Sequence, residues 1–191
     1  MQPKELIRIL STVSSLKDNT RHSWTPNGRR ESVAEHCWRL SLFAYFMKDE
    51  FPDADINKVI LMCIVHDIGE AFTGDIPSFL KSENDEDEEQ LALLNWVNSL
   101  PAPYNNELLK IYEEIQEQKT VEAKLFNALD KLEAAISHNE ADISTWIELE
   151  YTLNPEYGFK ESQFSPYLKS LKEQTKIDSL KKIEDSKNKA Q

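Results

Sequence analysis

Residues 56–71, INKVILMCIVHDIGEA, constrain the fold and the chemistry of this chain more than any other segment. Apolar side chains surround the segment almost completely, which is typical of a helix buried in a protein interior. The pattern therefore predicts a central, buried helix over 56–71. The same helix carries an imidazole and a carboxylate side by side, His66 and Asp67, where the pattern predicts core. Burying both groups without partners would cost on the order of a few kcal/mol, and a metal ion would offset that cost.

Helical periodicity extends over most of the remaining chain. Because only four glycines occur among 191 residues, we expect an all-α fold, a compact single-domain helical bundle. Predicted helices cover about 3–16, 33–50, 86–99, 104–118, 120–139 and 142–153, and a weakly amphipathic one begins near 165. Residues 18–32 are predicted to form a loop. We assign residues 1–175 to one domain and expect the lysine-rich residues 176–191 to form a frayed tail.

Local signals mark where several of these helices begin and end. Ser32 followed by Glu35 predicts a capping box at the start of the 33–50 helix. The Gly74–Pro77 segment, GDIP, predicts a turn after the 56–71 helix. The acidic run at 83–89 is interpreted as a solvated helix start, where carboxylates favour the helix dipole.

The formal charge of −12 argues against duplex nucleic acid as a partner, because binding to phosphates requires a basic surface. No segment approaches the apolar length of a membrane span, and the N-terminal residues lack a signal-peptide pattern. We therefore expect a soluble, cytoplasmic protein with no membrane partner. Cys37 and Cys63 are expected to be buried free thiols, since no CxxC spacing occurs.

Two further residues join the His66-Asp67 pair as possible ligands. His36 lies at the edge of the apolar stripe of the 33–50 helix, and Asp130 borders the inward face of the 120–139 helix. Imidazoles and carboxylates are ligands for an exchangeable divalent cation. A single histidine or aspartate in such a position is usually structural, but the combination raises the case for metal. The residues alone leave a metal site and a structural role both open.

Three segments carry a resemblance to a known family: RHSWTPNGRRESVAEH at 21–36, HDIGEAFTGDIPS at 66–78 and ALDKLE at 128–133. Over about residues 5–150 the chain resembles the HD-domain phosphohydrolase superfamily, whose ligands follow the order H…HD…D. Within it, the chain resembles the 5′-deoxynucleotidase branch. The resemblance implies a bundle of the HD-domain type over 1–175, and metal ligands at His36, His66, Asp67 and Asp130.

The expected cofactor is one divalent metal ion, which could be Mn, Co, Fe, Ni, Mg or Zn. Four mixed nitrogen and oxygen ligands leave open positions for water and substrate, unlike a closed structural site. Superfamily members with two metals have extra histidines between the HD pair and the last aspartate. This chain has none between residues 67 and 130, so we expect a single metal.

The resemblance also implies roles for residues around the metal ligands. Glu70 matches a glutamate that assists catalysis, although a solvated carboxylate at a helix end is the alternative. Arg21 matches the arginine that grips the phosphate. The residue after that arginine is tryptophan in one branch and His22 here, whereas Trp24 reproduces the Arg-x-x-Trp of a second branch. Which of the two rings lines the phosphate pocket stays open.

The GDIPS segment matches the part of the family that contacts the sugar. By resemblance, the substrate-binding residues there are Asp75, Ile76, Pro77 and Ser78. Asp75 would accept a hydrogen bond from a 3′-hydroxyl, while close packing would exclude a 2′-hydroxyl; the alternative is that Asp75 only caps the following turn. No segment resembles a base-reading element, so we expect broad acceptance of bases.

The leading hypothesis is a metal-dependent phosphomonoesterase acting on deoxyribonucleoside 5′-monophosphates, with a small-molecule nucleotide as its partner. One alternative is a related HD hydrolase that acts on another small phosphate ester. A second alternative is a non-catalytic nucleotide-binding dimer, which would need neither Arg21 nor Glu70. The resemblance also implies a homodimer, supported independently only by the amphipathic helices.

Overall fold

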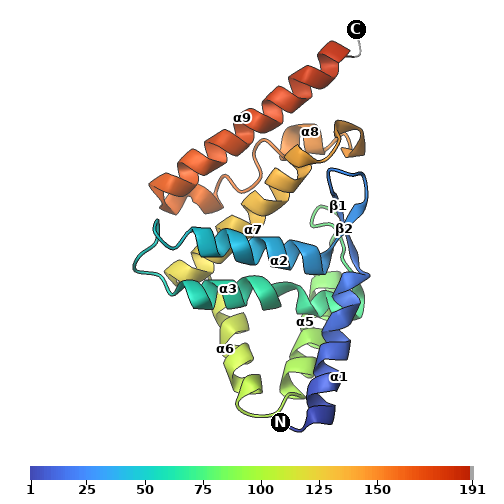
Figure 1. Ribbon diagram of the computed structural model, residues 1–191, viewed down its shortest axis with the longest axis vertical. Coiled ribbons are helices and arrows are strands. Elements are labelled where there is room, and N and C mark those ends of the chain that lie inside the picture. Colours follow the sequence, from blue (N-terminus) through green and yellow to red (C-terminus); the bar gives the residue numbers. More distant parts are fainter. Residues whose placement is uncertain (190–191) are drawn as a thin grey trace.

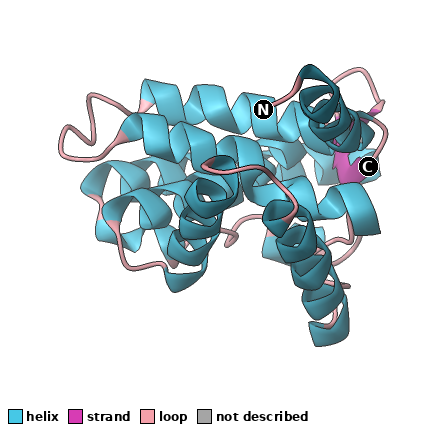
Figure 2. Cartoon of the chain, turned by 90° about the horizontal axis from the view of Figure 1, so that it is seen from below, coloured by secondary structure: helices cyan, strands magenta, loops and turns pink. Residues whose placement is uncertain are grey.

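The computed structural model describes residues 1–189 and is almost entirely helical (Figures 1 and 2). Its longest elements are α1 (Pro3–Val13), α2 (Val33–Phe46), α3 (Ile56–Val65), α5 (Glu83–Asn98), α6 (Tyr104–Glu117), α7 (Val121–Glu140) and α9 (Pro166–Lys189). Helices α2 and α3 lie side by side and α7 crosses behind both (Figure 1). Helix α9 packs on α7 at one end of the molecule, and α5 and α6 extend at the other. The all-α prediction is confirmed.

The core lies where α2, α3 and α7 meet. Its largest fully buried apolar side chains are Val33 and Leu40 from α2, Val59 and Met62 from α3, and Leu125, Leu129 and Leu132 from α7. The expected inward face of the 120–139 helix is therefore confirmed for its leucines. Cys37 and Cys63 are buried free thiols, as predicted.

The N-terminal part contains a short hairpin where a loop was predicted. After η1 (Ser14–Lys17), strands β1 (Thr20–Trp24) and β2 (Arg30–Ser32) pair in antiparallel fashion. The prediction of a loop over 18–32 was wrong because the segment shows no alternation of apolar and polar residues. The pairing is irregular, because Thr20 faces Ser32 and Trp24 faces Arg30. Between these two pairs, β1 therefore contains more residues than β2.

Capping boxes begin two of the helices, and the one at Ser32 confirms a prediction. Ser32 and Glu35 form the capping box that begins α2, with Ser32 N donating to Glu35 Oε2 at 2.9 Å. Ser82 and Asp85 form a second capping box, at the start of α5, where the acidic run was expected.

Two expected helices and the expected tail differ from the structure. The predicted 56–71 helix divides into α3, η2 (His66–Gly69) and α4 (Glu70–Thr73). The predicted 142–153 helix is reduced to η3 (Ile143–Thr145) and α8 (Glu150–Leu153), and η4 (Glu161–Phe164) precedes α9. In the expected frayed tail, residues 176–189 continue α9, with Ser179 and Ile183 buried. Residues 190–191 lie outside the described part, and the division of the chain at residue 176 stays a prediction.

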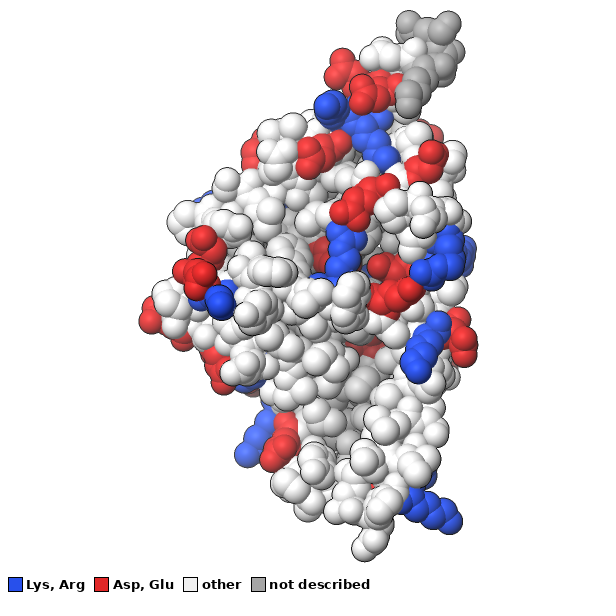
Figure 3. Space-filling model, in the orientation of Figure 1, with Lys and Arg blue, Asp and Glu red and all other residues white. Residues whose placement is uncertain are grey.

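The expectation that the third helix is buried on all sides was wrong. One face of α3 exposes Leu61 and Ile64, and the adjoining face of α2 exposes Trp38, Leu42 and Phe46. We call these five residues the outer apolar face. The surface over α2 and α3 is largely without charged side chains (Figure 3). An apolar run that surrounds a helix therefore does not show that its own chain covers every face. Here one face of α3 would be covered only by a partner.

Among the described residues, no helix combines the length and the apolar composition needed to cross a membrane.

Candidate metal centre and substrate cavity

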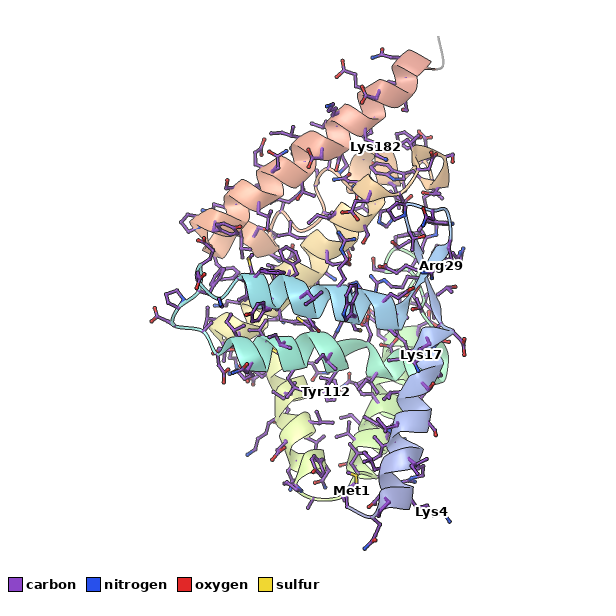
Figure 4. The ribbon with its side chains drawn as sticks, viewed as in Figure 1. Met1, Lys4, Lys17, Arg29, Tyr112 and Lys182 are labelled. Atoms are coloured by element: carbon purple, nitrogen blue, oxygen red, sulfur yellow. The ribbon has the colours of Figure 1, made fainter. Side chains whose placement is uncertain are left out.

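The helix breaks at the His-Asp pair, and the break brings the two side chains together. Asp67 has φ −95° and ψ 15°, outside the helical range, between α3 and α4. In an unbroken helix, adjacent side chains would point about 100° apart. The hydroxyl of Tyr112, labelled beside α3 in Figure 4, donates a hydrogen bond of 2.7 Å to Val65 O. This bond ties α6 to the end of α3, directly before the break.

The four predicted ligands converge on one point. His66 Nε2 lies 3.0 Å from Asp67 Oδ2 and 3.7 Å from Asp130 Oδ1. His36 Nε2 lies 3.1 Å from Asp130 Oδ1 and 4.0 Å from Asp67 Oδ2. His36, His66 and Asp67 together form a group that can hold a metal ion. The structure therefore brings together residues separated by nearly a hundred positions, from α2, η2 and α7.

A second set of contacts aims both imidazoles at that point. His36 Nδ1 lies 2.6 Å from Glu133 Oε2, and His66 Nδ1 lies 3.0 Å from Cys63 O. A carbonyl oxygen only accepts hydrogen bonds, so Nδ1 of His66 carries a proton and Nε2 faces the ligand point. Metal-binding histidines typically donate their other nitrogen in this way.

Glu133 is the residue of this centre that sequence reasoning missed. It is 1% exposed, and besides His36 it accepts a hydrogen bond from Ser137 Oγ at 2.9 Å. The signal was present: Glu133 is the last residue of the ALDKLE segment and interrupts the apolar stripe of α7, three residues after Asp130. A buried charge at such a position requires partners.

The chemistry of the ligand set fits a divalent cation. Nε2 of His66 is buried and makes no hydrogen bond. Burial alone would raise the pKa of Asp67, but His66 and Arg21 outweigh it and hold that pKa below its usual range. Burial likewise opposes ionisation of Asp130, whereas Lys131 and His36 lower its pKa strongly. Two ionised carboxylates beside two imidazole nitrogens form a site of mixed oxygen and nitrogen ligands.

Arg21 and Glu70 lie beside this centre, as predicted. Arg21 Nη1 is 3.3 Å from Asp67 Oδ2, and its buried Nε has no hydrogen-bond partner. Glu70 is buried at the start of α4, and its Oε2 also lacks a partner. Burial, together with the charges of Asp67 and Asp75, raises the pKa of Glu70 to about 9. The alternative of a solvated helix-end carboxylate therefore does not describe Glu70.

A cavity of about 180 Å³ opens from the metal centre. The GDIPS turn lines one wall, so Asp75, Ile76, Pro77 and Ser78 all face it. Gly74 adopts a φ of 79°, a left-handed conformation that suits glycine and lets the chain turn sharply here. Burial raises the pKa of Asp75, although Arg21 opposes the shift.

Of the two rings that the sequence left open, His22 lines the cavity and Trp24 does not. Trp24 packs its ring edge against His22 with centroids 4.9 Å apart, and Arg30 stacks on Trp24. Trp24 faces a separate depression beside Glu35 and Arg39. Arg29 pairs with Glu35 on the surface, at the outer edge of the hairpin (Figure 4).

Sequence reasoning also missed the wall formed by the second half of the molecule. This wall consists of Lys131, Ala134 and His138 from α7, Glu150 and Leu153 from α8, and Asn154 and Tyr157 beyond it. Lys131 Nζ lies 3.1 Å from Asp130 Oδ2 and stacks on Tyr157. Apart from Lys131, which lies in the ALDKLE segment, no motif marks these positions, because they are single residues without a fixed spacing.

The arrangement can bind an anionic ligand next to a cation and move a proton there. The cavity is lined by Asp67 and Asp130 of the candidate metal centre, by the guanidinium of Arg21 and by the buried carboxyl group of Glu70, whose raised pKa keeps a proton available at neutral pH. A phosphate ester matches the positive charge of a cation flanked by Arg21.

Comparisons with known proteins agree with this geometry. The sequence profile described as HD domain matches residues 13–172. The chain is 30% identical to 5′-deoxynucleotidase HDDC2 of Homo sapiens, over 72% of this chain and 68% of that protein. It is 27% identical to 5′-deoxynucleotidase YBR242W of Saccharomyces cerevisiae, over 70% of this chain and 59% of that protein.

Two solved structures share the fold. A predicted metal-dependent phosphohydrolase from Magnetospirillum magnetotacticum superposes with a TM-score of 0.79 at 20% identity, covering 94% of this chain and 93% of that one. A conserved hypothetical protein from Pyrococcus furiosus gives a TM-score of 0.70 at 26% identity, covering 90% and 99%. With the H…HD…D ligands gathered at one point and the family profile matched over most of its length, the chain belongs to the HD domain family.

Proposed function

We propose that this protein is a metal-dependent phosphomonoesterase that hydrolyses deoxyribonucleoside 5′-monophosphates to deoxynucleoside and phosphate. One observation carries the proposal: Asp67 and Asp130 of the candidate metal centre line the same cavity as Arg21, Glu70 and residues 75–78 of the GDIPS turn, and both carboxylates adjoin His36 and His66. The relatives named 5′-deoxynucleotidase support the same substrate class.

His36, His66, Asp67 and Asp130 hold the divalent cation in this proposal. When bound, the cation supplies Lewis acidity, which makes water a stronger nucleophile and neutralises charge on the phosphate. Arg21 binds the phosphate through its guanidinium, whose buried Nε makes no hydrogen bond within the protein. The reaction forms a bond between a water oxygen and phosphorus and breaks the bond from phosphorus to O5′ of the nucleoside.

Glu70 manages the proton of this reaction at Oε2, the buried atom without a hydrogen-bond partner. Its raised pKa favours the protonated form, and a nearby positive charge would lower that pKa. The group can therefore take the proton from the attacking water and hand one to the leaving O5′.

Asp75 holds the sugar by accepting a hydrogen bond from the 3′-hydroxyl, and the apolar Ile76 and Pro77 pack beside it. A 2′-hydroxyl would enter this apolar wall without a partner, which costs on the order of 1–3 kcal/mol. Deoxyribonucleotides are therefore the expected substrates.

The test is a panel of the deoxyribonucleoside and ribonucleoside 5′-monophosphates, assayed for phosphate release with Mn, Co, Fe, Ni, Mg or Zn. We expect metal-dependent release with a preference for the deoxyribonucleotides. Equal turnover of both sugars, or faster turnover of a non-nucleotide ester, would favour a related HD hydrolase. Nucleotide-dependent thermal stabilisation without phosphate release under any metal would instead indicate a non-catalytic binding protein.

We also propose that the protein is a homodimer that buries the outer apolar face. Trp38 is 65% exposed and Phe46 is 70% exposed on a surface largely without charged side chains, and a second copy offers a matching apolar surface. Sedimentation at micromolar concentration should give a dimer, and Phe46→Glu should shift it to the monomer. Lys17→Glu, an exposed change elsewhere, is the control. A wild-type monomer would remove this proposal.

The partners proposed for the protein are small molecules. The net charge of −12 opposes binding to nucleic acid. A cytoplasmic location stays a prediction from the sequence.

A further inference from the structure

The end of the cavity away from the metal centre holds a charged cluster that the proposed reaction does not use. It consists of His22 from β1, His138 from α7 and Glu150 from α8, and we call it the imidazole cluster. His138 Nε2 lies 2.8 Å from Glu150 Oε1, and His22 Nε2 lies 3.2 Å from the same oxygen. All three side chains line the cavity.

The hydrogen bonds of the cluster define its charges. His138 Nδ1 lies 2.9 Å from Ala134 O, and a carbonyl oxygen only accepts, so Nδ1 donates. Nε2 then donates to the carboxylate, which makes His138 and Glu150 an ion pair. Glu150 Oε2 is occupied by the backbone amide of Ile147 at 2.8 Å.

His22 is left without a complete set of hydrogen bonds. Its buried Nε2 approaches Glu150 but is not aligned for a hydrogen bond. The ring is nonetheless held in place by the edges of Trp24 and Phe79, with centroid distances of 4.9 and 5.6 Å. A fixed ring with an unsatisfied polar atom at a cavity wall is prepared for a ligand.

The irregular pairing of the hairpin places His22 in this wall. In a regular strand, consecutive side chains point to opposite faces, so Arg21 and His22 could not both face the cavity. Between the pairs Thr20–Ser32 and Trp24–Arg30, β1 contains more residues than β2. The side chains of Arg21 and His22 both line the cavity. Such irregularities often redirect side chains beside active sites.

A structural role alone explains the cluster poorly. A buried ion pair is often no more stabilising than apolar residues of the same size, because desolvation offsets the attraction. Apolar side chains would fill the end of this cavity equally well. The polar groups therefore point to a ligand with polar groups of its own.

Helix α7 locates that ligand along the cavity. Asp130 belongs to the metal centre, and His138 follows eight residues later on the same helix, which corresponds to about 12 Å of helix rise. Between them the cavity is lined by Ala134, whose small side chain leaves room. Phosphate, sugar and base follow one another in a nucleotide, so a phosphate at the metal and a sugar at the GDIPS turn direct the base to the imidazole cluster.

We propose that the imidazole cluster is the nucleobase subsite, where His22 and the His138–Glu150 pair meet the hydrogen-bonding edge of the base. The inference rests on the proposed function for the position of the phosphate. It replaces the expectation of a cavity without any base-contacting element.

The test compares each deoxyribonucleoside 5′-monophosphate with 2-deoxyribose 5-phosphate, which lacks the base. The main variant is His22→Phe, which keeps a ring against Trp24 and Phe79 but removes both nitrogens. We expect kcat/KM for at least one nucleotide to fall about threefold to tenfold, the effect of one hydrogen bond, while 2-deoxyribose 5-phosphate changes less than about twofold. The double variant His138→Gln with Glu150→Gln, which removes the ion pair without leaving a lone charge, should act in the same direction.

Tyr151→Phe is the matched control, because Tyr151 neighbours Glu150 on α8 but does not line the cavity. It should leave both substrates unchanged. Thermal unfolding of each variant shows whether the fold is retained.

Calorimetric Kd values for the same ligands in EDTA provide a readout that needs no turnover. The nucleotides should bind more weakly to His22→Phe than to wild type, and 2-deoxyribose 5-phosphate should bind equally. Equal losses for all ligands, or no loss for any nucleotide, would overturn the subsite. If wild type hydrolyses none of the compounds, the proposed function fails, and the Kd comparison still decides whether the cluster contacts a base.

Discussion

The two ends of the cavity are built differently although one helix, α7, contributes to both. At the metal end, Asp130 meets three ligands drawn from two short motifs, and each imidazole is oriented by a further buried partner. At the far end, His138 meets single residues from β1 and α8, and His22 remains incompletely bonded. The comparison indicates that the metal end is built from residues that lie in short sequence motifs. The far end, where we place the base, is assembled from isolated residues.

The largest effect that would separate the two ends is expected from Asp67→Ala. Removing this ligand takes away the cation and the several kcal/mol of catalysis that it supplies, so phosphate release should fall by about 10³-fold or more for every substrate. Phosphate-release assays with and without metal check this. The exposed Asp49→Ala serves as control, and a fully active Asp67→Ala would contradict the whole assignment of the metal end.

Glu70→Gln should give the next largest effect. We expect kcat to fall about 10²- to 10⁴-fold, because the variant loses a proton-transferring group.

The pH dependence of stability supplies a second measurement for Glu70. Because the pKa of Glu70 is raised to about 9 in the folded protein, the folded state holds a proton that the unfolded state has released. The contribution of Glu70 to stability is therefore present at low pH and is lost as pH rises toward that value.

In EDTA, the Tm of wild type should consequently decline more between pH 5 and pH 9 than the Tm of Glu70→Gln. Parallel pH profiles of Tm for the two proteins would show that Glu70 is not the buried acid described here.

Glu133→Gln tests the orienting contacts of the metal end. The amide keeps the shape but loses the charge that holds His36 Nδ1, so metal affinity should fall about 10- to 100-fold. Titrating Mn while following Tm measures the affinity. Glu140→Gln, also on α7 but exposed, is the matched control. An unchanged affinity would mean that His36 does not depend on Glu133.

Ala134→Leu should give the smallest effect of the series and act between the two ends. The larger side chain fills the path along α7, and we expect KM for nucleotides to rise by about tenfold, equivalent to roughly 1.4 kcal/mol, with unchanged metal affinity. Steady-state kinetics and the same Mn titration check both parts. A simultaneous loss of metal affinity would indicate that α7 itself has shifted.

The sequence made the metal end predictable because its residues lie in segments with a recognisable order. His36, His66, Asp67 and Asp130 could be identified before any geometry was known, and the structure brings all four together. The helix cap at Ser32 was a local signal of the same kind. Glu133 was within reach, since a charged residue in a buried stripe must have a partner.

The far end and the helix break could not be predicted in the same way. His138 and Glu150 are single residues whose meeting depends on how the chain folds after α7. The break at Asp67 requires tertiary support, including the Tyr112 hydrogen bond from a helix more than forty residues away. The hairpin segment shows no alternation of apolar and polar residues. Neither its strands nor their irregular register could therefore be predicted from the sequence.

Because α7 is one continuous helix from Val121 to Glu140, it acts as a rigid spacer between reaction and recognition. Its length cannot be adjusted gradually: one inserted residue between Asp130 and His138 would move the far wall by about 1.5 Å and also rotate it by about 100°, out of the cavity. Related proteins that accept longer or shorter ligands must therefore change the side chains along this helix, or the loops that face it, and keep its number of residues constant.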